Sequence, residues 1–154
     1  MVVPPFQTFL EAHRGAVLRF LMGLAGPGEA EDCFQETFLA ALRAYPALAD
    51  GRNLRAWVLT IAHRKAMDAH RSRRRRAIPV EEPPESVAPD APIGEPEVWE
   101  AVHSLPEGQR AAVLLRYVED LPYRDIGAVV GCSEGAARQR VREGLRSLRK
   151  VVER

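Results

Sequence analysis

Polar side chains near the end of the chain occur at a spacing suited to reading a nucleic acid. In GCSEGAARQRVREGLRSLRK (131–150), apolar residues recur every three or four positions, which predicts one buried helix face. Arginine and glutamine are the side chains that commonly pair with guanine and adenine edges in the major groove. The faces left in solvent would carry such groups together with one acid: Glu134, Arg138, Gln139, Arg142, Arg146 and Arg149.

The residues before this helix predict a helix-turn-helix. Tyr123 and the apolar residues after it recur at helical spacing across 122–130. Gly131 favours the left-handed conformation that ends a helix, and Ser133 is placed to cap the next one. Because the second helix of such a motif enters the major groove, the pattern favours DNA binding. The alternative is an ordinary helical hairpin whose arginines are only solvated.

Two stretches in the first half also suggest contacts with DNA. HRKAMDAHRSRRRR (63–76) contains seven basic residues and a single acid, Asp68, a density that repels itself unless an anion is nearby. GRNLRAW, just upstream, combines a turn with Asn53, Arg55 and an aromatic ring, an inventory that suits exposed single-stranded bases. A solvated helix end is the alternative for the first stretch, and core packing is the favoured interpretation of Trp57.

The stretch EDCFQETF indicates a different kind of interaction. Phe34 and Phe38 fit a buried helix stripe, whereas the other side of the helix would carry Asp32, Gln35 and Glu36 close together. That face is either solvated or a docking surface for a large basic partner.

Catalytic, metal and membrane functions are not indicated. His63 and His70 could share a helix face, but no Cys or Glu completes a metal-binding set. Cys33 and Cys132 lie far apart, which argues against a disulfide framework and fits a reducing compartment. Neither a P-loop nor a G-x-S-x-G motif occurs, and no apolar run is long enough to span a membrane. We therefore expect a soluble, cytoplasmic protein without a cofactor, a metal, membrane insertion or enzymatic activity.

The apolar pattern predicts that all these side chains stand on helices. No alternating strand pattern of useful length occurs, so we expect an all-α fold. Helices are predicted over the first 45 residues, from about Leu54 to Arg73, and at 96–103, 107–118, 122–130 and 134–151. Their predicted buried faces comprise Phe6, Phe9, Leu10, Val17 and Leu21; Cys33, Phe34, Phe38, Ala41, Leu42 and Tyr45; Trp57, Val58, Ile61 and Ala62; and Ala137, Val141, Leu145 and Leu148.

A proline-rich acidic segment divides the chain. Residues 77–96 lack a periodic apolar pattern, and proline there blocks helix formation. Charge follows the same division, with a net charge of +5 for residues 1–76, −7 for 77–104 and +3 for 105–154. We therefore predict two small helical domains, at 1–76 and 97–154, joined by a flexible linker at 77–96.

In this order the pieces resemble the sigma-70 family, and specifically its small extracytoplasmic-function (group IV) sigma factors, over nearly the whole chain. AEDCFQETFLAAL (30–42) is similar to the core-polymerase-binding helix of region 2. LRAWVLTIAHRKAMDAHRSRRRR (54–76) is similar to the promoter-melting and minus-ten recognition helix. The stretch from LPEGQR to SLRK (105–150) is similar to region 4, including its helix-turn-helix. The resemblance implies a bacterial transcription initiation factor, of a kind often tied to stress responses.

The resemblance also implies partners for matching residues. The beta-prime clamp helices of core RNA polymerase would be bound by Glu29, Asp32, Gln35, Glu36 and Leu39. The minus-ten promoter element would be contacted and opened by Asn53, Arg55, Arg64, Lys65, Asp68 and Arg71. The minus-thirty-five element would be read by Ser133, Glu134, Arg138, Gln139, Arg142 and Arg146. The polymerase beta flap and an anti-sigma factor are the further partners implied.

Two departures from the family pattern bear on these roles. Where the family commonly has Gly-Thr-Val-Lys-Ser-Arg, this chain has Gly-Ala-Ala-Arg-Gln-Arg (135–140), which removes a hydroxyl that could contact phosphate. The promoter sequence is therefore not carried over from relatives. Pro122 stands where a capping Ser or Thr is common, and proline is tolerated in a first helical turn.

Two other interpretations remain open from the sequence. A stand-alone helix-turn-helix regulator would need a dimer interface and would have no use for EDCFQETF. A sigma mimic that only binds an anti-sigma factor would need no arginine-rich DNA-binding faces.

Overall fold

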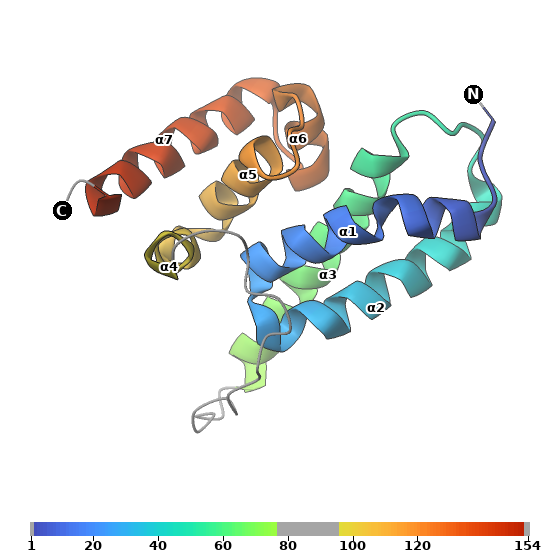
Figure 1. Ribbon diagram of the computed structural model, residues 1–154, viewed down its shortest axis with the longest axis horizontal. Coiled ribbons are helices and arrows are strands. Elements are labelled where there is room, and N and C mark those ends of the chain that lie inside the picture. The colour runs from blue at the N-terminus through green and yellow to red at the C-terminus, as the bar shows by residue number, and fades with distance from the viewer. Residues whose placement is uncertain (1, 77–95, 153–154) are drawn as a thin grey trace. The chain divides into compact units, whose positions relative to one another are not determined.

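The computed structural model describes residues 2–76 and 96–152. Within these residues every regular element is a helix, so the predicted all-α fold is confirmed. These helices belong to two units (Figure 1). The first unit holds α1 (Phe6–Ala25), α2 (Pro27–Ala44), the 3-10 helix η1 (Tyr45–Ala47) and α3 (Leu54–Arg76). The second holds α4 (Pro96–Ser104), α5 (Glu107–Tyr117), α6 (Tyr123–Val130) and α7 (Glu134–Val152). The predicted linker lies outside the described residues, except for Pro96, which begins α4.

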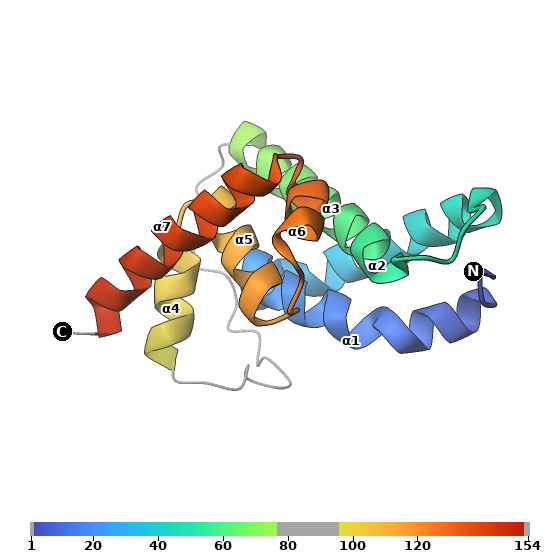
Figure 2. The same cartoon turned by 90° about the horizontal axis from the view of Figure 1, so that it is seen from above.

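In the first unit, α1, α2 and α3 each pack against the other two (Figure 2). Gly26 connects α1 to α2 with a φ of 82°, and its N–H donates to the carbonyl of Met22 at 3.1 Å. Pro27 follows as the first residue of α2, where its missing N–H is tolerated because first-turn N–H groups have no partner within a helix.

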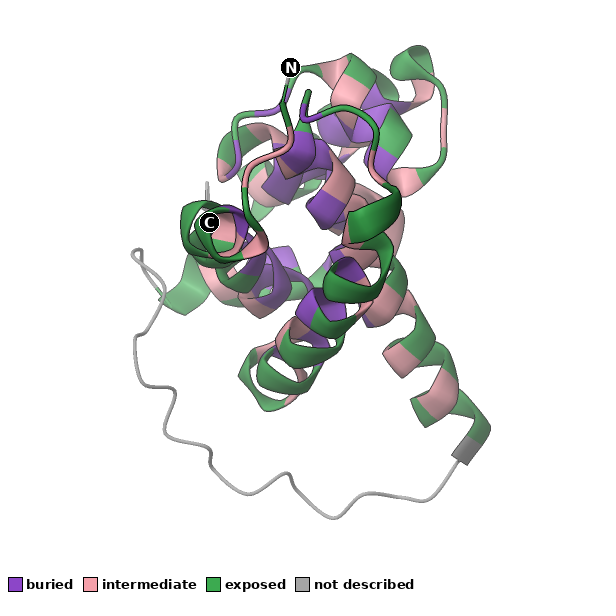
Figure 3. Ribbon diagram, turned by 90° about the vertical axis from the view of Figure 1, so that its right-hand side faces the viewer, coloured by how far each residue is buried: buried purple, intermediate pink, exposed green. Residues whose placement is uncertain are grey.

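The core of this unit is built from large side chains of α1 and α3 against Phe38 and smaller side chains of α2. Phe9, Phe20, Leu21 and Leu59 are at most 1% exposed. Figure 3 shows such buried segments facing the interior of the helical bundle. The Phe9 ring lies 5.6 Å from that of Trp57, so Trp57, although half-buried, packs within an aromatic cluster as expected.

Some predicted core positions differ from the structure. The assignment of Leu42 to the buried face is wrong, because 50% of this residue is exposed. Phe34 is only half-buried, although its ring contacts Phe38 at 4.9 Å. Phe20 and Leu59 are fully buried core residues that the predicted stripes omitted. The physical reason is that a bundle of three helices covers only a narrow face of each one, so flanking apolar positions remain in solvent.

The turn expected at the start of GRNLRAW forms around Asp50 and Gly51 and positions the start of α3. The Asp50 carboxylate accepts a hydrogen bond from the Arg52 backbone N–H at 3.0 Å. A Cβ atom added to Gly51 would lie 2.7 Å from the carbonyl oxygen of Val2. Glycine is therefore required here by the close approach of the N-terminal backbone.

The second unit packs α7 against α5 and α6, with α4 also touching α7. Ile126 and Val141 are buried, while Leu145 and Leu148, predicted to be buried, are half-buried. A Cβ on Gly144 would lie 2.6 Å from Val113 Cγ2, so α7 approaches α5 more closely than any side chain at position 144 permits. Glycine, rather than a further apolar side chain, sets the contact between these helices.

Arg110 joins α4 to α5 in a way that the sequence did not predict. Its guanidinium donates hydrogen bonds to the carbonyl oxygens of Val102 at 3.2 Å, His103 at 2.5 Å and Leu105 at 2.9 Å. Carbonyls at a helix C-terminus lack partners within the helix, so the cation satisfies them. Burial lowers the pKa of Arg110, although an arginine stays charged at any physiological pH.

Candidate functional site

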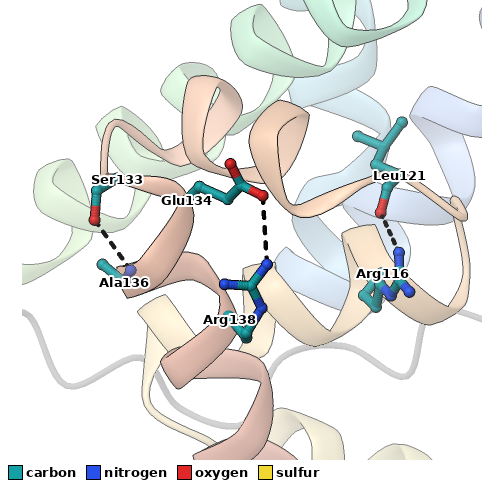
Figure 4. A network of polar contacts seen from close by, with 6 residues as sticks. All are labelled: Arg116, Leu121, Ser133, Glu134, Ala136 and Arg138. Atoms are coloured by element: carbon teal, nitrogen blue, oxygen red, sulfur yellow. Dashed lines mark hydrogen bonds and ion pairs between the residues drawn. The ribbon is translucent and has the colours of Figure 1, made fainter.

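The helix-turn-helix predicted from Gly131 and Ser133 is present. Gly131 adopts the left-handed conformation (φ 80°, ψ 40°) and its N–H donates to the carbonyl of Gly127 at 2.8 Å. Ser133 Oγ accepts a hydrogen bond from the backbone N–H of Ala136 at 3.0 Å, which caps α7 (Figure 4). Pro122 precedes α6 in an extended conformation, so it flanks the first helical turn rather than standing inside it.

Helix α7 and its capping residue Ser133 expose the six side chains assigned to the minus-thirty-five element. Its opposite side is buried through Ala137, Val141 and Gly144. The polar side chains are held by neighbours one turn away: Arg138 pairs with Glu134 at 3.3 Å, and Gln139 donates to Glu143 at 3.0 Å. The exposed set comprises Ser133, Glu134, Arg138, Gln139, Arg142 and Arg146.

Tyr123 belongs to this surface, which sequence reasoning missed. The ring, half-buried at the start of α6, has the guanidinium of Arg116 at 4.5 Å and that of Arg138 at 4.9 Å from its centroid. Both distances are within the range of cation–π attraction. The sequence signal that could have found it was an aromatic residue next to two arginine-bearing helices, but periodicity only grouped the ring with the apolar residues of its own helix.

The basic part of α3, like the polar side of α7, is exposed. Arg64, Asp68 and Arg71 share one helix face, and the Asp68 carboxylate pairs with Arg71 at 2.6 Å. Lys65 is half-buried, and its backbone carbonyl lies 4.0 Å from the Cys33 sulfur. This part of α3 therefore presents a cationic surface in which Asp68 is already engaged.

Asn53, just before α3, and Arg55, in its first turn, differ in how far they are exposed. Asn53 is exposed with a φ of 54°, a left-handed conformation that asparagine tolerates, and its carbonyl accepts the Trp57 N–H at 3.2 Å. Arg55 is half-buried and lies with Arg14 and Arg19 of α1 around a surface concavity of about 530 Å³. Burial, and then the Arg55 charge, lower the pKa of His13 beside it, which favours the neutral imidazole.

The polar face of α2 forms one continuous exposed stripe. Asp32, Gln35, Glu36 and Leu39 are all exposed, Leu39 by 53%, and their spacing places them on successive turns. The exposed Leu42 continues the stripe by one more turn. The stripe therefore presents carboxylate, amide and apolar groups side by side to solvent.

Glu29 differs from the other residues assigned to polymerase binding. Its carboxylate forms an ion pair with Arg73 of α3, and its side chain is only 18% exposed. Its contact therefore joins α2 to the basic tract of α3 instead of leaving a free acid on the stripe.

Cys33 is a packing residue beneath this stripe. It is 2% exposed, and burial, followed by the charges of Glu29, Glu36 and Asp32, raises its thiol pKa to about 11. The thiol therefore stays protonated and unreactive at physiological pH. Among the described residues, no group of three or more His, Cys, Asp or Glu side chains could hold a metal ion. No helix of residues 2–76 or 96–152 is both long and apolar enough to cross a membrane.

Family models and relatives match both units. Residues 9–76 match the family model described as Sigma-70 region 2, and residues 96–148 match the one described as Sigma-70, region 4. RNA polymerase sigma factor CarQ of Myxococcus xanthus is 33% identical over 96% of this chain and 88% of its own length. ECF RNA polymerase sigma factor SigC of Mycobacterium tuberculosis is 33% identical over 88% of this chain and 76% of its own. ECF RNA polymerase sigma factor SigE of Mycolicibacterium smegmatis is 31% identical over 96% of this chain, which spans 61% of that protein.

A solved structure supports the same assignment. The sigma factor RpoE of Bartonella quintana, crystallised with the anti-sigma factor NepR, matches with a TM-score of 0.83 and 25% identity over 96% of both chains. CnrH, solved with the cytosolic domain of CnrY, matches at 21% identity with a TM-score of 0.71 over 96% of this chain and 87% of that one, which supports the fold alone. With both regions matched in order and relatives aligned over most of its length, the chain belongs to the sigma-70 family, as a member of the extracytoplasmic-function group of RNA polymerase sigma factors.

Proposed function

We propose that this chain is a dissociable sigma subunit that binds core RNA polymerase, selects promoters and helps to melt them, with no chemistry of its own. The observation that carries the proposal is the presence of three different surfaces in one small chain. These are the exposed acidic stripe of α2, the cationic face of α3 and the helix-turn-helix of α6 and α7.

The stripe of α2 suits the beta-prime clamp helices of the polymerase. Asp32, Gln35 and Glu36 offer carboxylate and amide groups to a basic partner, and Leu39 adds an exposed apolar contact. Glu29 takes part if its ion pair with Arg73 opens on binding. In this role the stripe distinguishes a polymerase subunit from a regulator that binds DNA alone.

Residues 1–76 would act on the minus-ten element. Asn53 and Arg55 stand at the start of α3, and Arg64, Lys65, Asp68 and Arg71 follow along the helix. Cations neutralise the phosphates of strands being separated, and the exposed Asn53 can contact a base edge.

Residues 97–154 would bind the minus-thirty-five element as a duplex. The N-terminal part of α7 carries Arg138, Gln139 and Arg142, at positions from which a recognition helix reads base edges. Ser133 and the N-terminal N–H groups of α7 would hold a phosphate, since helix N-termini attract anions. The beta flap of the polymerase is the expected protein partner of this domain.

The proposal is tested with purified core RNA polymerase in a pull-down and in a reconstituted transcription assay. The wild-type chain is expected to bind core polymerase and to support transcription from its promoter. The double variant Asp32→Ala, Gln35→Ala is expected to lose at least about tenfold in polymerase affinity, equivalent to 1.4 kcal/mol. Glu11→Ala is the control, because this exposed acid lies on a different helix, α1. A double variant that binds like the wild type would contradict the proposed docking face.

The partners and location follow from the same role. A sigma subunit works where the polymerase is, so we place the protein in the bacterial cytoplasm. RpoE of Bartonella quintana was solved with an anti-sigma factor, and we infer that this chain too is controlled by an anti-sigma factor. Recovery of such a protein with the tagged chain from its own cells, in competition with core polymerase, is the expected result.

A further inference from the structure

The ring of Tyr123 connects the three helices that make up the DNA-reading part of the second unit. It is the first residue of α6, and the guanidiniums of Arg116 from α5 and Arg138 from α7 each lie over its ring. The centroid distances of 4.5 and 4.9 Å are short enough for both guanidiniums to interact with the π electrons.

Each of the two arginines has a second contact that fixes its orientation (Figure 4). Arg116 Nη1 donates to the carbonyl oxygen of Leu121 at 3.1 Å, in the segment that leads into α6. Arg138 Nη2 lies 3.3 Å from Glu134 Oε1, one turn earlier on α7. The Arg138 guanidinium is therefore located by a ring and by a carboxylate, although its side chain is 48% exposed.

This arrangement matters because a long exposed arginine otherwise samples many rotamers. Ordering such a side chain on binding costs free energy, and a side chain already held near its bound orientation avoids part of that cost. Arg138 is the fifth residue of α7, within the N-terminal part that recognition helices direct at bases. The carboxylate of Glu134 and the ring of Tyr123 thus act on the residue placed best to read sequence.

We propose that Tyr123 is a positioning residue for promoter recognition. Its ring, together with Glu134, holds the Arg138 guanidinium in the orientation from which it donates two hydrogen bonds to the N7 and O6 acceptors of a guanine in duplex DNA. Arg116, fixed by the Leu121 carbonyl, keeps the ring in place from the other helix. The inference rests on the proposed function of the second unit, and it adds a residue, Tyr123, that the sequence did not indicate as part of the DNA-reading surface.

The test uses holoenzyme reconstituted from core polymerase and the full chain, with promoter fragments randomised in the minus-thirty-five region. Tyr123→Leu is expected to reduce the preference for guanine at one position about three- to tenfold while binding to promoters lacking that guanine stays unchanged. Tyr123→Phe keeps the ring and is expected to retain the preference. Arg138→Ala is expected to lose the same preference, and adding Tyr123→Leu to it is expected to change nothing further.

A merely structural tyrosine would give a different pattern. A loss of affinity that is uniform over all sequences, or an effect of Tyr123→Leu that persists in the Arg138→Ala background, would overturn the inference. If Tyr123→Leu fails to fold, Glu134→Ala removes the other contact of the same guanidinium. It is expected to weaken the same guanine preference, and a uniform loss over all sequences again overturns the inference.

The proposed function fails separately from this inference. A wild-type holoenzyme that selects no promoter sequence contradicts the function itself. A selective wild type that loses nothing with Arg138→Ala, or loses its preference with Arg138→Ala but not with Tyr123→Leu, contradicts only the role of Tyr123.

Discussion

Helices α3 and α7 are both long and rich in arginine, yet they are anchored in different ways. The buried positions of α3, such as Val58, Leu59 and Ala62, stop at Ala66, and the helix then continues as an exposed arginine run. In α7 the buried residues Ala137, Val141 and Gly144 alternate with the exposed Arg138, Gln139 and Arg142, and acids on the same helix hold Arg138 and Gln139. An anchored helix with ordered polar groups suits readout of a rigid duplex, whereas a cationic end beyond the core suits phosphates of strands that change shape.

A substitution at Gly144 disrupts the contact between α7 and α5 most directly. We expect Gly144→Leu to destabilise the second unit by about 3 kcal/mol, because the new side chain overlaps Val113. Thermal unfolding followed by circular dichroism measures the loss. Gly135→Leu is the matched control on the same helix, since a Cβ there meets no atom within 4 Å, and its stability is expected to stay within about 0.5 kcal/mol. Equal losses for both variants would mean that α5 does not hold α7.

Substitutions of single arginines on α7 and on α3 are expected to affect DNA binding in different ways. Arg142→Ala on α7 is expected to cost about 1–3 kcal/mol of discrimination at one base pair. Arg74→Ala or Arg75→Ala on α3 is expected to weaken binding to all promoters alike and to lower the salt dependence by about 0.7–0.9 for each phosphate that is no longer neutralised. Holoenzyme affinity measured over a salt series and two promoter sequences gives both quantities. The proposed difference between α3 and α7 is contradicted if the affinity loss of Arg74→Ala depends on promoter sequence, or if that of Arg142→Ala does not.

The N-cap of α7 tests how much one hydrogen bond contributes to the anchoring of this helix. Ser133→Ala removes the acceptor of the Ala136 N–H and is expected to cost about 1 kcal/mol of unfolding free energy in the second unit. Ser133→Asp retains a capping oxygen and is expected to unfold like the wild type. Chemical denaturation of the three proteins measures the difference, and a Ser133→Ala variant as stable as wild type would show that the cap contributes nothing.

The smallest effect is expected at the ion pair that ties α2 to the arginine run of α3. Arg73→Gln removes the ion pair with Glu29 and is expected to cost about 0.5 kcal/mol at low salt, less at high salt, because the arginine is 65% exposed. Arg75→Gln, at another exposed position of the run, is the control and is expected to leave stability unchanged. A loss that does not respond to salt would argue against an ionic origin.

Predictions from the sequence succeeded where the signal is local. They failed where the packing of other helices decides whether a side chain is buried. Gly131 ends α6 in the left-handed conformation and Ser133 caps α7, as predicted, because both effects act within a few residues. Leu42 has the periodicity of a core residue but is exposed. Tyr123, which periodicity grouped with the apolar residues of its helix, is half-buried and has two guanidiniums over its ring. Most of the site residues were indicated by residue type and spacing, whereas their roles came from the resemblance and remain predictions.

The sequence by itself determined the helical fold, its turns and the family, because periodicity, glycine and capping residues act over one or two helical turns and the motifs occur in order. Only the tertiary structure decided which polar groups are already engaged. The pairing of Glu29 with Arg73, and the placing of Arg138 against Tyr123, each join residues from different helices. Such pairings depend on how helices pack in space, and no spacing along the chain encodes that distance.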